Sequence, residues 1–182
     1  LIKCKKCHLV QLDRSFNSNY LYGLDYGYRS GINLTMTSHL KSISKKLSNL
    51  TKLKKDDFVL DIASNDATLL NSYKILGVKK VGVDPIFKKF YKRIDFKISK
   101  FFSKKIIQEA KIKKKFKIIT ACAVFYDIEN PNKFLKDISD LIDKKNGIFY
   151  LEFQDLLSII KNDLFDTICH EHLEYYSFKV IN

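Results

Sequence analysis

Two aspartates, each at or near the end of an apolar run, are the residues of this chain best placed to do chemistry. Asp61 lies in Val59-Leu60-Asp61-Ile62, and Asp84 ends Val81-Gly82-Val83-Asp84. Asp84 comes 23 positions after Asp61 (84 − 61), close to the ~20-residue spacing at which an acid on a second strand meets the ribose of a nucleotide cofactor. A carboxylate suits this role because it accepts hydrogen bonds from vicinal hydroxyls. The alternative is that both aspartates only cap the helices that follow.

The turn after the first run, Ala63-Ser64-Asn65-Asp66-Ala67, contains no glycine. NAD binding uses the glycines of G-x-G-x-x-G to bring backbone close to a pyrophosphate, so this cofactor is disfavoured. A sulfonium cofactor has no phosphate, and it needs carboxylates for its amino group and ribose. We therefore expect an S-adenosylmethionine site formed by residues of the turn and of both runs, namely Asp61, Ser64, Asn65, Asp66 and Asp84.

His170-Glu171-His172 is the densest ionisable cluster in the chain. It is not H-E-x-x-H, so its histidines do not share a helical face as metalloprotease ligands do. Histidine titrates near neutrality and can act as a general base, and a neighbouring carboxylate can orient it. The alternative is a polar loop cluster without a catalytic role.

Cys4 and Cys7 form a C-x-x-C pair, which is half of a tetrahedral zinc site because structural zinc takes four ligands. With His8 the pair also matches the C-x-x-C-H spacing of haem attachment, and a surface pair without a ligand is the third alternative. Cys122 and Cys169 have the isolated positions of reduced thiols, which favours a cytoplasmic protein.

Apolar periodicity places these residues on alternating strands and helices, which predicts an α/β fold with a doubly wound, mostly parallel sheet. The strands are expected at 58–63, 80–84, 96–98, 117–125 and 148–153. The helices are expected at 32–50, 66–76, after Pro85, at 103–112, at 131–142 and at 154–162.

The net charge is +13, but only three basic residues are arginines, Arg14, Arg29 and Arg93. Readers of nucleic acid usually depend on arginine for bidentate contacts, so nucleic-acid binding is disfavoured, although it stays open as an alternative. No apolar run reaches the ~18 residues of a membrane span. A negatively charged small substrate would benefit from this positive field.

Several segments together resemble the sugar C-methyltransferases, which are class I S-adenosylmethionine-dependent enzymes that methylate a carbon of a nucleotide-linked keto sugar. The resemblance covers nearly all of the chain and rests on five segments: 26–31 (Tyr-Gly-Tyr-Arg-Ser-Gly), 59–66, 82–85, 125–131 and 165–177, the last containing His170-Glu171-His172. It implies a nucleotide-sugar substrate and a Rossmann-like domain behind a zinc module. It also implies a base that removes the proton alpha to the ketone, for which His172 is the candidate, with Glu171, His170 and Tyr28 as further catalytic residues.

The resemblance implies three parts: the second half of a zinc module at 1–13, a connector at 14–31 and the methyltransferase domain at 32–182. The first C-x-x-C of the module and the last strands of the sheet are not in the sequence, so a fragment of a longer protein is expected. Ala63 and Ala67 replace the usual turn glycines, and Cys169 stands where the family often has Tyr.

Three further sites have less certain roles in the sequence alone. Tyr26, Tyr28 and Arg29 either bind the nucleotide sugar or pack as a loop. Asp127 is expected to cap the helix that begins near Pro131, and His39 is expected to be a surface or packed residue rather than a catalyst. An oxygen- or nitrogen-directed methyltransferase also remains an alternative, because it would need no carbon-acid base.

Overall fold

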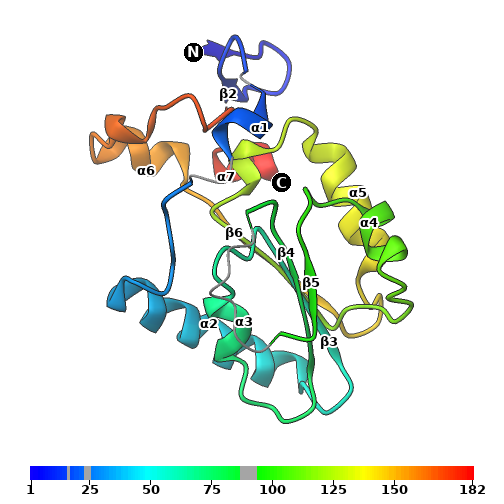
Figure 1. The fold of residues 1–182 in the computed structure, drawn as a ribbon. Helices are drawn as coiled ribbons and strands as arrows, with labels where there is room; N and C mark the ends of the chain where they lie inside the picture. The colour runs from blue at the N-terminus through cyan, green and yellow to red at the C-terminus, as the bar shows by residue number, and fades with distance from the viewer. Residues whose placement is uncertain (16, 23–25, 87–93) are drawn as a thin grey trace.

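A five-stranded parallel sheet forms the centre of the protein (Figure 1). The computed structural model describes residues 1–15, 17–22, 26–86 and 94–182. The strand order is β5-β4-β3-β6-β7, with all four neighbouring pairs parallel. The strands are β3 (Phe58–Ile62), β4 (Lys79–Val83), β5 (Phe96–Ile98), β6 (Ile118–Cys122) and β7 (Ile148–Glu152).

Helices cover both faces of this sheet. Successive side chains of a strand point to opposite faces, and both faces carry apolar side chains that need to be buried. Leu60, Val81 and Ile119 point toward α4 (Lys104–Glu109) and α5 (Pro131–Leu141). Val59 and Ile118 point toward α2 (Leu34–Thr51) and α3 (Thr68–Ser72) on the opposite face. Figure 1 shows the two helix pairs on opposite sides of the strands. The prediction of a doubly wound α/β fold is confirmed.

Several predicted elements are shorter than the apolar pattern indicated, and the backbone explains two of them. The helix expected at 66–76 ends at Ser72, because Tyr73 takes an extended conformation with ψ 121°. The strand expected at 117–125 ends at Cys122, because Ala123 has φ 52° and the chain turns into the 3₁₀ helix η1 (Phe125–Asp127). The helix expected after Pro85 falls largely on 87–93, outside the described residues.

A second, antiparallel sheet joins the two ends of the chain. It has the order β1-β2-β8 and consists of β1 (Ile2–Lys3), β2 (Val10–Gln11) and β8 (Glu174–Tyr175). The segment expected to be an irregular connector contains a short helix, α1 (Ser18–Leu21). The chain ends with α6 (Leu156–Lys161), η2 (Phe165–Thr167), β8 and α7 (Phe178–Ile181).

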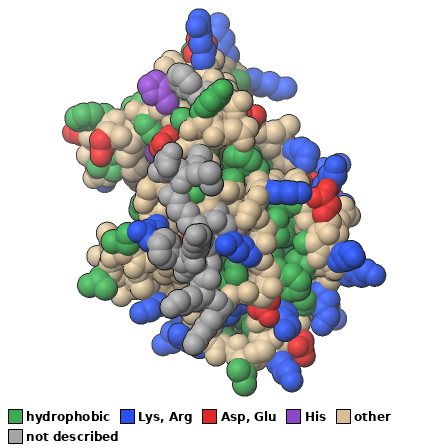
Figure 2. Space-filling model, in the orientation of Figure 1, with side chains coloured by type: hydrophobic (Ala, Val, Ile, Leu, Met, Phe, Trp, Pro, Cys, Tyr) green, Lys and Arg blue, Asp and Glu red, His purple; other side chains and the backbone are tan. Residues whose placement is uncertain are grey.

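Lysine and arginine side chains are spread over the face shown in Figure 2, with acidic side chains among them. Such a distribution is typical of a solvated surface rather than of one basic track for nucleic acid. Among the described residues, no helix combines the length and the apolar character that crossing a membrane requires.

Candidate functional site

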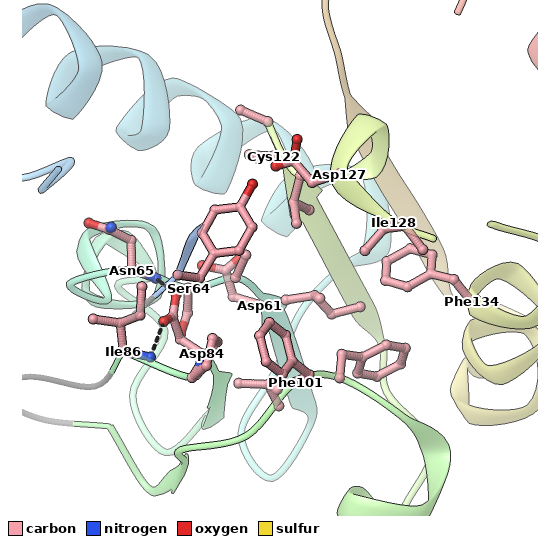
Figure 3. Close-up of a pocket in the computed structure, with 18 of the residues that line it drawn as sticks. Asp61, Ser64, Asn65, Asp84, Ile86, Phe101, Cys122, Asp127, Ile128 and Phe134 are labelled. Carbon is pink, nitrogen blue, oxygen red and sulfur yellow. Dashed lines mark hydrogen bonds between the residues drawn. The ribbon is translucent and has the colours of Figure 1, made fainter. Parts of the chain in front are cut away.

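A cavity of about 600 Å³ opens at the carboxyl ends of β3, β4, β6 and β7. This is the edge at which ligands bind in open parallel sheets. Loops that follow the strands form most of the wall, and the connector before α2 closes part of it (Figure 3). The residues that line it and carry polar groups include Tyr22, Tyr26, Tyr28, Asp61, Ser64, Asn65, Asp84, Tyr126, Asp127 and Glu152.

Asp84 is fixed at the end of β4 by two backbone donors. Its Oδ1 accepts from the N–H of Ile86 at 2.7 Å, and its Oδ2 accepts from the N–H of Asn65 at 2.8 Å. Burial raises the pKa of this carboxyl group, and the two N–H groups partly offset that effect. The side chain is therefore held rigidly at the cavity, where each carboxylate oxygen keeps a lone pair for a further hydrogen bond.

Asp61 lies deeper, in β3 itself, and is almost completely buried. Thr120 on the neighbouring β6 donates its hydroxyl to Asp61 Oδ1 at 2.6 Å. Burial raises the pKa of Asp61 to about 7 against the opposing effect of Thr120. Asp61 does not cap the next helix, since the N-cap of α3 is Ala67.

The turn between β3 and α3 adopts a glycine-like backbone without glycine. Ala63, Asn65 and Ala67 have φ of 54°, 51° and 61°, all in the left-handed region. An L residue in that region costs roughly 1–2 kcal/mol, least for asparagine. The alanines that replace the usual turn glycines therefore keep the turn geometry at a cost in stability.

Asn65 and Asp66, which the sequence predicts to bind the cofactor, use their side chains to bind the connector. Asn65 accepts from the N–H of Ser30 at 3.0 Å and donates to the carbonyl of Tyr28 at 2.9 Å. Asp66 accepts from the N–H of Gly31 at 2.7 Å, and it is not among the described residues that line the cavity. A Cβ on Gly31 would lie 2.7 Å from Asp66 Oδ2, so this close approach requires glycine.

The connector brings three tyrosines to the cavity. Tyr28, which was predicted to act in catalysis, lines it and is about half exposed. Tyr22 and Tyr26 also line it, with their rings 5.6 Å apart, and burial raises the pKa of both hydroxyls. The sequence left open whether Tyr26 binds the substrate or packs as a loop residue. Sequence reasoning did not identify Tyr22 as a site residue.

Asp127 does not have the capping role predicted for it. The N-cap of α5 is Asn130, whose side chain accepts from the N–H of Lys133 at 3.0 Å. Asp127 instead lines the cavity, where the hydroxyl of Tyr22 is hydrogen-bonded to its carboxyl group. Burial raises its pKa to about 8, and the charge of Glu171 adds to that effect.

His172 lies beside the cavity wall rather than on it. Its ring packs against that of Tyr126, with centroids 4.3 Å apart, and its Nδ1 lies 2.7 Å from the carbonyl oxygen of Thr167. A carbonyl can only accept, so Nδ1 carries the proton and Nε2 of the neutral ring keeps its lone pair. The orienting group for Nδ1 is thus a backbone carbonyl.

Glu171 and His170, which were also predicted to be catalytic, differ in their exposure to solvent. Glu171 is half-buried, and its charge raises the pKa of Tyr22, Tyr26 and Asp127. His170 is exposed. Neither residue is among the described lining of the cavity.

Residues 36–179 match the model of a family described as a methyltransferase domain. The chain belongs to this methyltransferase family. It is 24% identical over 181 residues to the C-methyltransferase NovU of Streptomyces niveus, a match that covers 97% of this chain and 43% of that protein. The chain thus spans less than half the length of this curated relative.

Solved structures of two plantazolicin methyltransferases, both with SAH and a triazolic desmethylPZN analog, share the fold of this methyltransferase domain. BamL has a TM-score of 0.57 at 21% identity, covering 76% of this chain and 54% of that chain. BpumL has a TM-score of 0.55 at 15% identity, covering 84% and 58%. The Rossmann-like arrangement inferred from the sequence is therefore that of known methyltransferases.

Cys4 and Cys7 lie in the turn between β1 and β2, remote in sequence from the methyltransferase domain. The N–H of Cys7, and then that of Lys6, hold the pKa of the Cys4 thiol below its ordinary value, which fits a thiolate ligand. In the described part of the chain, no group of three or more His, Cys, Asp or Glu could hold a metal ion. Two thiolates do not complete a structural zinc site, which takes four ligands.

Proposed function

We propose that this chain forms the cofactor-binding part of an S-adenosylmethionine-dependent methyltransferase that acts on a carbon alpha to the ketone of a nucleotide-linked sugar. The observation that carries the proposal is Asp84, which two backbone N–H groups fix at the carboxyl end of β4 on the wall of a 600 Å³ cavity. The name of the relative NovU, a C-methyltransferase, supports carbon as the acceptor.

The polar residues of the cavity fit the cofactor's ribose and amino acid parts. Asp84 would accept from the ribose hydroxyls. Ser64 is buried on the cavity wall, and its hydroxyl has no hydrogen-bond partner among the described residues, so it is suited to a ligand group. Asp61 supplies a second carboxyl group for the amino end. When bound, S-adenosylmethionine supplies an electrophilic methyl group.

Apolar side chains line part of the cavity and fit an adenine ring. Ile86, Phe101, Ile128 and Phe134 surround this part of the cavity in Figure 3. An aromatic base buries apolar area against such side chains.

The residues on the substrate side fit a base-assisted reaction at carbon. His172 Nε2 would accept the proton from the carbon alpha to the ketone, since its Nδ1–H is bound to Thr167. Tyr126 lines the cavity and packs against the imidazole, so His172 would reach the substrate beside this ring. Tyr28 and Tyr26 would contact the sugar or its phosphates from the connector.

The experiment is deuterium exchange in heavy water, with a nucleoside-diphosphate-linked keto sugar as the probe. The chain is incubated with S-adenosylmethionine and the probe, and mass spectrometry follows both methyl and deuterium incorporation. We expect a methyl group on carbon and, without cofactor, deuterium at the same carbon. Methylation without exchange would favour an oxygen- or nitrogen-directed enzyme. Binding of nucleic acid that weakens steeply with salt would instead favour a nucleic-acid-binding module.

A further inference from the structure

Asp127 is a carboxyl group on the cavity wall to which the proposed reaction assigns no role so far. It ends η1, directly after β6, and so lies at the same sheet edge as Asp84. Figure 3 shows Asp127 with Cys122 on one side of the cavity and Asp84 with Ser64 and Asn65 on the other. A ligand between these two walls would contact both.

One oxygen of Asp127 has no partner. Its Oδ1 is buried and has no hydrogen bond among the described residues, although the hydroxyl of Tyr22 lies near the carboxyl group. A buried polar atom without a partner is uncommon in folded proteins and indicates a ligand site or a functional group. Because Asp127 does not cap α5, helix capping does not account for this side chain.

The groups that face Asp127 favour its protonated form. Tyr22 and Tyr26 face it from the connector, Glu171 from the segment before β8, Tyr126 from its own turn and Tyr175 from β8. Four of these five are neutral tyrosines at physiological pH, and the fifth is an acid. Burial and the charge of Glu171 together raise the pKa of Asp127 to about 8, so the carboxyl group is mostly protonated at pH 7.

We propose that Asp127 is a catalytic residue that donates a hydrogen bond from its protonated Oδ1 to the substrate oxygen on which enolate charge develops. This role rests on the proposed function. The carbon–hydrogen bond breaks, its proton passes to His172 Nε2, and its electron pair moves toward the carbonyl oxygen. When the carbon takes the methyl group, whose bond to the cofactor sulfur would break with its electron pair left on sulfur, the carbonyl double bond re-forms and Asp127 keeps its proton.

The chemistry requires a neutral donor at this position. A buried carboxylic acid that stays protonated can stabilise an enolate oxygen by donating a hydrogen bond to it. A carboxylate would instead repel the developing negative charge. The active form of Asp127 is therefore the acid, and turnover should fall as the pH rises through about 8.

The test compares Asp127→Asn with Asp127→Ala, using the nucleotide-linked keto sugar and the exchange assay. Asparagine keeps a neutral donor, so Asp127→Asn should retain at least about a tenth of the turnover and lose the alkaline decline near pH 8. Asp127→Ala should lose about 10²–10³-fold in turnover, as enzymes do when one oxyanion donor is removed. Asp163→Asn, an exposed position away from the cavity, is the matched control and should behave as the wild type.

Two further measurements make each outcome decisive. Calorimetry should show unchanged SAH affinity in both Asp127 variants, which separates loss of catalysis from misfolding. Infrared difference spectra should show a protonated carboxyl band that titrates near pH 8 and is missing in Asp127→Asn. If the wild-type chain shows neither exchange nor methylation, the proposed function and this role are both overturned. If Asp127→Ala keeps turnover within about twofold of the wild type, or if the infrared band is absent, this role alone is overturned.

Discussion

The two walls of the cavity are built in different ways. On the cofactor wall, Asp61 lies in β3, Ser64 follows β3 and Asp84 follows the adjacent β4. Thr120 of β6 holds Asp61, and backbone N–H groups just after β3 and β4 hold Asp84. On the substrate wall, Tyr22, Tyr28 and Asp127 come from segments distant in the chain, and His172 packs against Tyr126 beside that wall. Hydrogen bonds and ring contacts between these segments hold the residues in place. The cofactor wall therefore depends on sheet formation, whereas the substrate wall depends on the docking of loops.

The small sheet β1-β2-β8 provides that docking. The N–H of Leu12 donates to the carbonyl of Leu173 at 2.8 Å, and the N–H of Leu173 donates to the carbonyl of Tyr126 at 2.9 Å. These bonds connect the N-terminal hairpin, the residue after His172 and the turn after β6. The hairpin with Cys4 and Cys7 is therefore linked to the position of the proposed base.

The largest expected effect concerns the substrate wall alone. His172→Ala should lower turnover by about 10²–10⁴-fold, the usual contribution of a general base, and abolish deuterium exchange at the substrate carbon. SAH affinity, measured by calorimetry, should stay unchanged. Exchange that persists in His172→Ala but stops in His170→Ala would identify the other histidine as the base, and exchange that persists in both would make the cluster structural.

The next effect concerns the stability of the cofactor wall. The pKa of Asp61 is about 7 in the folded chain and ~3.9 when unfolded, so the folded state binds more protons between these values. Stability should therefore fall as the pH rises from about 4 to 7. Asp61→Asn should remove roughly 2–4 kcal/mol of that fall, measured by urea unfolding across the range. The control Asp56→Asn, at an exposed position, should keep the wild-type pH dependence.

Asp84→Ala should affect cofactor binding without changing the base. It removes the charged partner of two ribose hydroxyls, worth about 1.5–3 kcal/mol, so SAH affinity should fall about 10–100-fold. Deuterium exchange in the absence of cofactor should continue near the wild-type rate. Equal SAH affinity in the variant and the wild type would contradict the ribose assignment, and so would tight binding of NAD.

The smallest effect tests the link between the hairpin and the substrate wall. Leu12→Pro removes the N–H that donates to Leu173, a bond worth about 0.5–1.5 kcal/mol. Turnover should fall about 2–10-fold with unchanged SAH affinity. Leu12→Ala keeps the N–H and serves as the matched control. Equal turnover in the two variants would show that the hairpin does not position His172.

The sequence by itself determined the strands of the central sheet, the helices on its two faces and the location of Asp61 and Asp84, because these depend on local apolar periodicity and on short turns. It did not reveal that Asn65 and Asp66 bind a connector 35 positions earlier, since such pairing arises only when the loop closes on the sheet. Three features near the substrate likewise required the tertiary structure. They are the unpartnered Oδ1 of Asp127, the approach of Tyr22 to the Asp127 carboxyl group and the hydrogen bond of His172 Nδ1. Burial and charge at these groups come from segments distant in the chain, and no spacing in the sequence records them.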